Sequence, residues 1–166
     1  MRAGIAFGSN LGDRLANLSA ARARILQLPG LEKPILASSV YETEPVDCEP
    51  GTGKFLNAVI EIGYDGAGQE LLRELKEIES ALGRLESHVR NASRTLDLDL
   101  LYFGPIIISR PQLELPHPRM KDRRFVLEPL AQIRPDLILP GENRRVASLL
   151  EGLPDQSPLL PVASEW

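Results

Sequence analysis

Residues that form disulfides or bind soft metals are scarce in this chain of 166 residues. It has one cysteine, Cys48, and only two histidines. A lone cysteine cannot form an intrachain disulfide, and neither it nor the histidines have the spacing of a metal site. We therefore expect a protein of a reducing compartment, the cytoplasm.

Long hydrophobic runs are also missing. No segment approaches the roughly 20 apolar residues of a membrane span. The beginning of the chain, residues 1–7, is a short strand-like run without the long apolar core and small-residue cleavage site of a signal peptide. We therefore expect no association with a membrane.

Positive charge is not in excess. Lys and Arg number 19 against 23 Asp and Glu, which gives a formal net charge of −4. Proteins that coat nucleic acid usually carry a broad basic face, so this balance argues against a nucleic-acid partner. Arginines crowd residues 84–94 and 119–124, and this predicts a local positive pocket for a small anionic ligand.

The composition is that of a folded globular domain. Hydrophobic residues make up 43% and charged residues 25% of the chain, and its length suits one domain with a substantial core. We expect a single catalytic domain over residues 1–166. The segment 154–166, rich in proline and serine, is expected to be a loosely ordered tail.

Hydrophobic periodicity and turn residues divide the chain into strands and helices. Asp13 is suited to cap the first helix, and Gly83 to end the second. The predicted order is strand, helix, strand, strand, helix, strand, over residues 3–7, 14–28, 35–41, 55–64, 71–82 and 95–103, with loops at 44–54 and 84–94.

This order predicts an α+β fold. Two helices on one face of an antiparallel sheet form the ferredoxin-like βαββαβ arrangement. C-terminal strand and helix additions follow, namely a strand at 106–108 and a short helix at about 122–133.

In the strand predicted at 55–64, residues that face the core alternate with residues that face the other way. Successive side chains in a strand point to opposite faces, so Phe55 and Asn57 share one face while Leu56 and Ala58 share the other. Asparagine is disfavoured in the middle of a strand, which favours a ligand-binding role for Asn57.

Two aspartates stand two residues apart in the strand predicted at 95–103. Asp97 and Asp99 therefore project from one face, about 6.5 to 7 Å apart, and leucines cover the other face. Two carboxylates at this spacing can share a pair of divalent cations. The alternative is a solvated edge strand, but like charges side by side are unfavourable without a cation between them.

Several motifs, in order along most of the chain, resemble the 6-hydroxymethyl-7,8-dihydropterin pyrophosphokinase family of folate biosynthesis. The motifs are Gly8-Ser9-Asn10-Leu11, Phe55-Leu56-Asn57-Ala58, Arg94-Thr95-Leu96-Asp97-Leu98-Asp99, Pro116-His117 and Met120-Lys121-Asp122-Arg123-Arg124-Phe125. The resemblance implies that Asp97 and Asp99 bind two Mg²⁺ ions that bridge ATP and the pterin. The pterin hydroxyl then attacks the β-phosphorus of ATP, and AMP leaves. The resemblance also implies a monomer.

The resemblance assigns further roles to residues around this pair. Arg84 and Arg94 match the family's catalytic-loop arginines, and such a reaction depends on charge neutralisation. The residues implied to contact ATP are Glu79, Arg90, His117 and Arg123. The residues implied to contact the pterin are Thr43, Val46, Phe55, Asn57 and Phe125, with the two phenylalanines on either side of the ring and Asn57 at its edge.

The chain departs from the family pattern in the loop at 84–94 and beyond it. Asn91 and Glu86 stand where the family often has a tryptophan and an arginine, and Gln112 stands where an ATP-contacting arginine is common. In the family this loop closes over ATP, so we expect retained activity with an altered affinity for the nucleotide.

Two other functions remain open. A two-metal nucleotidyltransferase also carries paired aspartates on a ferredoxin-like sheet, but it attacks the α-phosphorus and releases pyrophosphate. A non-catalytic ferredoxin-like binding module would display aromatic and basic residues on its open face, whereas this chain has Asp97 and Asp99 there.

Overall fold

The computed structural model describes residues 1–45, 51–83, 94–154 and 159–166. In this part of the chain, no helix is long and apolar enough to cross a membrane. The first seven elements are β1 (Arg2–Ser9), α1 (Arg14–Ile25), β2 (Leu31–Ala37), β3 (Val40–Thr43), β4 (Phe55–Tyr64), α2 (Gly68–Ala81) and β5 (Asp97–Phe103).

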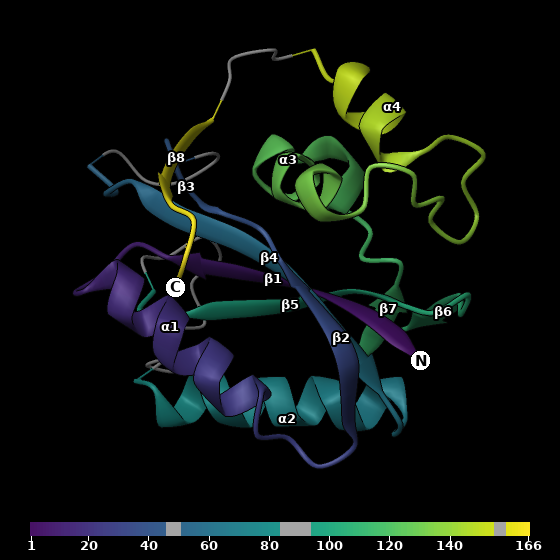
Figure 1. Cartoon of the computed structure of the whole chain (residues 1–166), viewed down its shortest axis with the longest axis horizontal. Coiled ribbons are helices and arrows are strands. Elements are labelled where there is room, and N and C mark those ends of the chain that lie inside the picture. The colour runs from purple at the N-terminus through teal and green to yellow at the C-terminus, as the bar shows by residue number, and fades with distance from the viewer. Residues whose placement is uncertain (46–50, 84–93, 155–158) are drawn as a thin grey trace.

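The main sheet is antiparallel, with the strand order β5-β1-β4-β3-β8, and β2 also pairs with β4. Strand β8 (Leu160–Ala163) is the last of the chain. The order β5-β1-β4 followed by β2 and β3 is the predicted ferredoxin-like arrangement, which is confirmed. Strand β5 therefore lies at one end of the sheet, and of the strands in the described residues only β1 pairs with it (Figure 1).

Helices α1 and α2 cover one face of the sheet, as predicted (Figure 1). Asp13 caps α1 by accepting a hydrogen bond from the backbone N–H of Ala16 at 3.1 Å. Gly83 follows α2 with a φ of 90°, a conformation that glycine adopts readily. The apolar side of both helices is buried against β1, β4 and β5, in a core that includes Leu18, Leu71, Leu75, Ile5, Phe7, Ile60 and Leu98.

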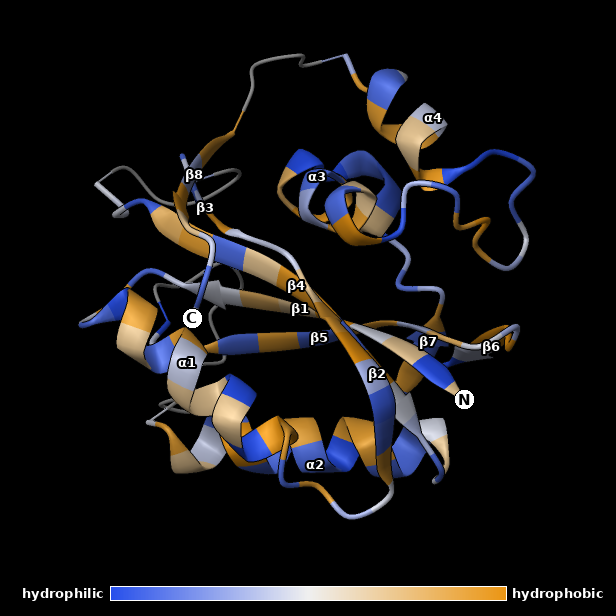
Figure 2. Ribbon diagram, viewed as in Figure 1, coloured by the Kyte–Doolittle hydropathy of each residue, from blue (hydrophilic) through white to orange (hydrophobic). Residues whose placement is uncertain are grey.

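A third helix, α3 (Arg124–Ile133), covers the opposite face, so helices lie on both sides of the sheet. It follows a short 3₁₀ helix, η1 (Met120–Asp122), and packs against α4 (Val146–Glu151). Its buried residues Val126, Leu127 and Leu130 join Val59 and Leu101 in a second core. Figure 2 shows α2 and α3, on opposite sides of the sheet, each striped with hydrophobic and hydrophilic residues, as expected of helices with one buried side.

The second core contains a buried carboxylate. Glu61 is only 1% exposed, and it accepts hydrogen bonds from Tyr102 Oη at 2.5 Å, Arg134 at 2.6 Å and Arg2 Nε at 2.9 Å. These bonds tie β4 to β1, β5 and the end of α3. They offset the cost of removing the charge from water.

The prediction of one continuous strand at 35–41 was wrong. The chain forms two strands, β2 and β3, which are separated by Ser38 and Ser39. Ser38 donates its backbone N–H to Val59 O and accepts from Val59 N through its side-chain oxygen, both at 2.9 Å. A side-chain bond thus takes the place of a ladder bond, and β3 can turn to a new register on β4.

The end of the chain is paired with the sheet, and the expectation of a loosely ordered tail was wrong for residues 160–163. Strand β8 pairs with β3 through Leu160 and Glu42. Beyond it, the Trp166 ring packs edge-on against Phe7 at 5.1 Å, and its Nε1 donates to Ser38 O at 2.9 Å. Between β5 and η1, β6 (Ile108–Arg110) and β7 (Leu113–Leu115) form a two-stranded hairpin, so the strand predicted at 106–108 starts two residues later and has a partner strand that was not predicted.

Candidate active site

Three neighbouring strands place an amide, a glycine and a carboxylate in one row. Gly8 of β1 lies opposite Asn57 of β4 on one side and opposite Asp97 of β5 on the other. In the next row, Ala6 lies between Val59 and Asp99. The central strand contributes only small residues here, so a cavity opens above it between β4 and β5.

Asp97 and Asp99 both line this cavity, as their two-residue spacing predicted. They are the first and third residues of β5, and both are half-buried, while Leu98 between them is buried in the core of the other face. Strand β5 begins two residues later than predicted, at Asp97 and not at Thr95.

The segment before β5 is held by the turn that follows β1. Ser9 Oγ donates to Thr95 O at 2.6 Å, Asn10 Oδ1 accepts from Arg94 N at 2.6 Å, and Asn10 N donates to Arg94 O at 3.1 Å. The Gly-Ser-Asn motif of the sequence therefore has a structural task that sequence reasoning did not assign to it. It fixes the chain immediately before the two aspartates.

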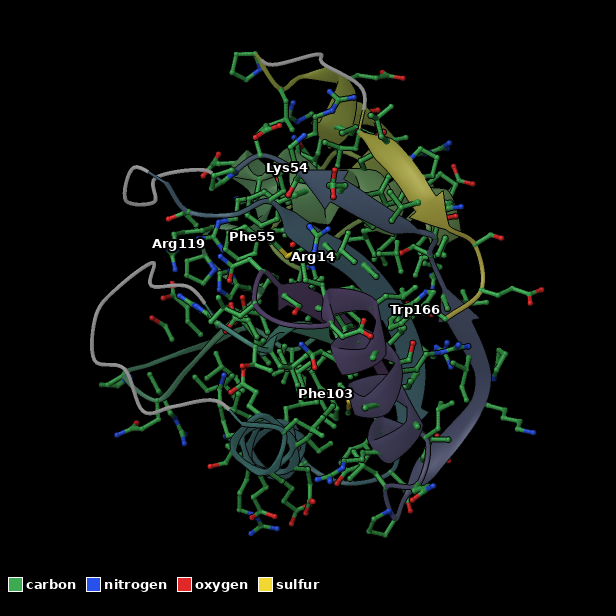
Figure 3. The ribbon with its side chains drawn as sticks, turned by 90° about the vertical axis from the view of Figure 1, so that its left-hand side faces the viewer. Arg14, Lys54, Phe55, Phe103, Arg119 and Trp166 are labelled. Atoms are coloured by element: carbon green, nitrogen blue, oxygen red, sulfur yellow. The ribbon has the colours of Figure 1, made fainter. Side chains whose placement is uncertain are left out.

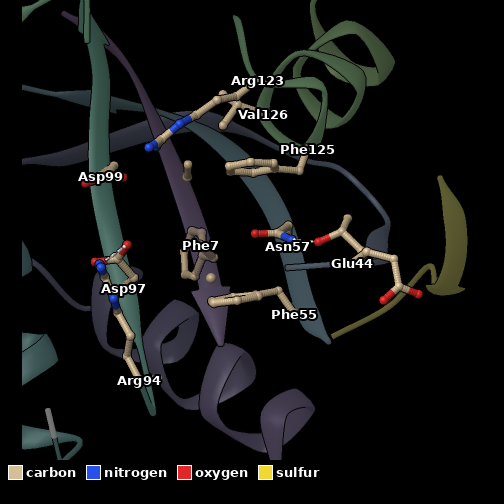
Figure 4. A pocket seen from close by; sticks show the side chains of 13 residues that line it. Phe7, Glu44, Phe55, Asn57, Arg94, Asp97, Asp99, Arg123, Phe125 and Val126 are labelled. Carbon is tan, nitrogen blue, oxygen red and sulfur yellow. Dashed lines mark hydrogen bonds and ion pairs between the residues drawn. The ribbon is translucent and has the colours of Figure 1, made fainter. Parts of the chain in front are cut away.

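Arg94 reaches from this segment into the cavity. Its Nη1 lies 2.7 Å from Asp97 Oδ2 (Figure 4), and both side chains are partly buried. The guanidinium provides positive charge beside one of the two carboxylates. Asp99 has no ion pair in the part of the chain that the structure describes.

Two aromatic rings face each other across the cavity. Figure 4 shows Phe55, the first residue of β4, below the opening and Phe125, in the first turn of α3, above it, with Asn57 between them. Asn57 is buried, and its Nδ2 donates to Thr43 Oγ1 at 2.6 Å. Its Oδ1 lies on the Gly8 side, 3.5 Å from where a Cβ of that residue would be. This geometry fits a flat ring with hydrogen-bonding groups along its edge.

Other residues around the rings were missed by sequence reasoning. Glu44 and Val126 line the cavity, and neither carries a sequence signal of binding. Lys54 pairs with Glu44 at 2.7 Å, and Arg14 of α1 pairs with Glu42 at 3.0 Å and donates to Lys54 O at 2.9 Å. Figure 3 shows Arg14, Lys54 and Phe55 at the same end of the molecule.

Arg123 lies over the outer face of the Phe125 ring, with 5.4 Å between its Cζ and the ring centroid. It lines the same cavity as the aspartates (Figure 4). Burial lowers the pKa of Arg123, and Arg119 adds to this effect, while Asp99 and Asp97 oppose it. The arginine remains charged, and a desolvated positive charge favours anions.

A second groove adjoins the first cavity, and Asp99 lines both. His117 lies in this groove with Gln112, Lys76 and Leu100. Burial lowers the pKa of His117, although Asp99 partly counters the effect, so the imidazole is neutral at pH 7. Its Nδ1 accepts from Arg119 N at 3.3 Å.

Not every predicted site residue is found at these openings. Val46, Arg84 and Arg90 lie outside the described residues. Glu79 lines neither opening and is almost completely buried in α2, where it accepts a hydrogen bond from Leu98 N. A contact between Glu79 and a nucleotide stays a prediction.

Comparison with known proteins gives a consistent result. The sequence model of one family, described as 7,8-dihydro-6-hydroxymethylpterin-pyrophosphokinase (HPPK), matches residues 4–135. This range contains all the residues that line the two openings.

Two bacterial relatives share a name, 2-amino-4-hydroxy-6-hydroxymethyldihydropteridine pyrophosphokinase. That of Bacillus subtilis is 45% identical over 129 residues, which cover 78% of this chain and 75% of the relative. That of Methylorubrum extorquens is 37% identical over 146 residues, which cover 88% of this chain and 90% of the relative.

Longer proteins also match. The folic acid synthesis protein FOL1 of Dictyostelium discoideum is 37% identical over 139 residues, 82% of this chain but 20% of the relative. The chain thus spans about a fifth of this relative's length.

The fold matches a Plasmodium falciparum HPPK-DHPS crystallised with pteroate, with a TM-score of 0.69 over 90% of this chain and 42% of that one. The identity is 15%, so this match shows the shared fold.

Proposed function

The chain belongs to the 7,8-dihydro-6-hydroxymethylpterin-pyrophosphokinase family, and on this basis we propose that it transfers the diphosphoryl group of ATP to the hydroxymethyl group of 6-hydroxymethyl-7,8-dihydropterin. The products are the pterin diphosphate, a precursor in folate biosynthesis, and AMP. One observation of the structure carries the proposal. The cavity between Phe55 and Phe125, which we name the aromatic slot, and the second groove share Asp99 as a lining residue, and Asp97 also lines the slot.

The pterin occupies the slot between Phe55 and Phe125. Asn57 meets the ring edge with its Oδ1, because its Nδ2 is engaged by Thr43. Gly8 and Ala6 of β1 leave space for the ring on the sheet side of the cavity, and this arrangement directs the hydroxymethyl group toward the aspartates. We also assign a main-chain contact to Val46, which lies outside the described residues.

ATP occupies the second groove, with its phosphates toward Asp99. His117 is neutral and can hydrogen-bond to the nucleotide without repelling a cation. Arg123 lines the first cavity together with Asp99 and can bind phosphate oxygens. Arg90, which lies outside the described residues, is assigned to the remaining ATP contacts.

In the chemical step, the pterin hydroxyl loses its proton to water while its oxygen forms a bond to the β-phosphorus of ATP. The bond from that phosphorus to the oxygen of the α-phosphate breaks, and AMP leaves. Such a displacement requires in-line positioning and charge neutralisation more than covalent help. Arg94, from the segment before β5, and Arg84 neutralise charge on the transferred group.

Asp97 and Asp99 fit a pair of Mg²⁺ ions that arrive with the nucleotide. Mg²⁺ is commonly held by one or two carboxylates, with water and substrate phosphates completing its shell. Among the described residues, no group of three or more His, Cys, Asp or Glu forms a fuller cage, which agrees with sites completed by phosphates. When bound, the ions supply charge neutralisation at the phosphates. Arg94 pairs with Asp97 at 2.7 Å and lines the same cavity, so it is suited to bind the triphosphate.

The direct test uses purified protein with ATP, Mg²⁺ and hydroxymethyl-dihydropterin, and follows AMP. AMP formation that requires the pterin supports the proposal. Pyrophosphate release would point to a nucleotidyltransferase instead. If neither AMP nor pyrophosphate forms, the remaining alternative is a non-catalytic binding module. RNA binding that survives replacement of Asp97 with Ala would support that alternative.

We further propose that residues 1–166 act as one domain and as a monomer in the cytoplasm. The sheet joins the first strand and the last within one structure, which supports the single domain. Light scattering of the purified chain measures the mass; a dimer mass would contradict the monomer.

A further inference from the structure

The strand that carries the two aspartates has an open edge. Within the part of the chain that the structure describes, strand β5 is the last of the sheet and pairs only with β1, where Leu98 lies opposite Phe7. Alternate residues of an edge strand direct their backbone N–H and C=O away from the sheet, where no strand can bind them. Leu98, between Asp97 and Asp99, is such a residue.

Helix α2 binds both of these backbone groups. Glu79 Oε1 accepts from Leu98 N at 2.6 Å, and Lys76 Nζ donates to Leu98 O at 3.2 Å. Lys76 Nζ and Glu79 Oε2 are also 2.9 Å apart as an ion pair between residues i and i+3 of the helix. We name Lys76 and Glu79, joined in this way to Leu98, the α2 clamp.

The clamp acts on the two peptide groups that orient the aspartates. Leu98 N belongs to the peptide group shared with Asp97, and Leu98 O belongs to the one shared with Asp99. A rotation of either peptide group would turn the carboxylate next to it away from the cavity. Because β5 begins at Asp97, the clamp adds to the bonds by which Ser9 and Asn10 hold the segment just before this end of the strand.

Packing alone does not explain Glu79. Its side chain is 1% exposed in the interface between α2 and the sheet, where a leucine would pack without removing a charge from water. A carboxylate at this position is favoured by what it binds, the N–H of Leu98. Lys76, in contrast, is half-exposed and lines the second groove together with Asp99.

We propose that Lys76 and Glu79 are positioning residues, which hold Leu98 so that the carboxylates of Asp97 and Asp99 keep the separation that divalent cations require. This role rests on the proposed function and deepens it. It assigns to Glu79 an action through the backbone of β5 in place of a direct contact with the nucleotide.

The test compares Glu79→Leu, which removes both the acceptor and the charge, with Glu79→Gln, which keeps an acceptor for Leu98 N. In Glu79→Leu, the Mg²⁺ concentration for half-maximal AMP formation should rise about tenfold or more, while the KM for the pterin changes less than about twofold. Glu79→Gln should restore most of the loss. Lys76→Met serves as a second variant, since its exposed position makes a folding defect improbable, and it should raise the same Mg²⁺ requirement.

A readout independent of turnover is hydrogen exchange at the Leu98 amide in the protein without substrates. Exchange should be about tenfold faster in Glu79→Leu than in the wild type, while the amide of Val59 in β4 should not change. Calorimetric titration of Mg²⁺ with a non-hydrolysable ATP analogue should show weaker metal binding. The control is Glu77→Gln on the same helix, whose ion pair with Arg73 is exposed and 3.7 Å long; it should change neither quantity.

Each contrary result has a definite meaning. An unchanged Mg²⁺ requirement in both Glu79→Leu and Lys76→Met would overturn the clamp. A second result would also overturn the clamp. If Glu79→Gln lowers the affinity for the ATP analogue by the same factor with and without Mg²⁺, Glu79 contacts the nucleotide directly. Failure of the wild type to form AMP would refute the proposed function, and the exchange and metal titration would then still decide on the clamp.

Discussion

The side chain of Asn57 donates to the hydroxyl of Thr43 at 2.6 Å, and this bond determines which end of the amide faces the cavity. The nitrogen is engaged, so the oxygen remains on the side of Gly8. A ligand in the slot therefore meets an acceptor and must supply an N–H donor. The pterin ring has such donors along its edge.

Replacing Thr43 with Val should remove the bond and release the amide to rotate. We expect the KM for the pterin to rise about fivefold, because a buried hydrogen bond contributes roughly 1 kcal/mol, with the KM for ATP unchanged. Steady-state kinetics with each substrate varied in turn measures both values. Thr43→Ser keeps the hydroxyl and should behave as the wild type. An equal rise in both KM values would contradict the assigned role.

Replacing Gly8 with Ala should narrow the slot without harming the fold. The added Cβ would lie 3.5 Å from Asn57 Oδ1 and 3.8 Å from Asp97 Cβ, which are ordinary contacts. The methyl group would, however, occupy the space for the ring on the sheet side of the cavity. We expect the KM for the pterin to rise about tenfold or more, with a free energy of unfolding within about 1 kcal/mol of the wild type. Unchanged pterin binding, measured by calorimetry, would place the ring elsewhere.

Replacing Asp99 or Asp97 with Asn should lower AMP formation by about a thousandfold or more, because each variant removes a negative charge from the site proposed for the cations. The pterin should still bind, since the aromatic slot is intact. The matched control is Asp65→Asn, at an exposed turn after β4, which should keep full activity. Activity of Asp99→Asn near that of the wild type would refute the two-metal proposal.

The buried Glu61 should make the fold sensitive to acid. Burial alone would raise its pKa, but hydrogen bonds from Tyr102, Arg134 and Arg2 outweigh burial and leave the pKa of Glu61 lowered. The ionised carboxylate therefore stabilises the fold fully above its usual pKa of 4.5. This stabilisation is lost progressively as the pH falls below that value and through the lowered pKa of the folded state.

We therefore predict that Glu61→Gln is less stable than the wild type at pH 7 and that this difference shrinks below pH of about 4.5. Urea unfolding followed by circular dichroism at several pH values measures it. Glu114→Gln, an exposed residue of β7, is the control. A difference that is constant down to pH of about 3 would contradict the prediction.

Trp166 should contribute to stability although it lies outside the regular elements. It contacts Phe7, donates to Ser38 O, and lies 5.3 Å below the guanidinium of Arg22. We expect Trp166→Ala to lower the free energy of unfolding by about 2 to 4 kcal/mol, and Trp166→Phe by about 1 kcal/mol, because phenylalanine keeps a ring but loses the donor. Leu160→Ala, at an exposed residue of β8, is the control. A Trp166→Ala variant as stable as the wild type would show that the end of the chain is not held by the ring.

Much of the central fold could be predicted because its signals are local. The two-residue period of a strand places Phe55 with Asn57, and Asp97 with Asp99, without any knowledge of neighbouring strands. The helical period and Gly83 predicted α2. The break at Ser38 and Ser39 was missed, since it depends on a side-chain bond to Val59 of another strand.

Contacts between distant residues had no comparable signal. Periodicity indicates which face a residue occupies, but not what lies on that face. Nothing local links Trp166 to Phe7, or Arg134 to Glu61, because such partners are chosen by the order of the strands. The roles of Ser9 and Asn10 in holding Arg94 and Thr95 were missed for the same reason.

The sequence by itself determined the pattern of faces: two carboxylates on one side of a strand, and an aromatic residue and an amide on one side of another. Only the tertiary structure decided that these sides are adjacent, since the register of β1 puts Gly8 between Asn57 and Asp97. Only the packing of α2 against the open edge of β5 brought Lys76 and Glu79 to the backbone of Leu98. The physical reason is that side-chain direction follows from local backbone geometry, whereas strand register and helix packing are set by the burial of the whole core.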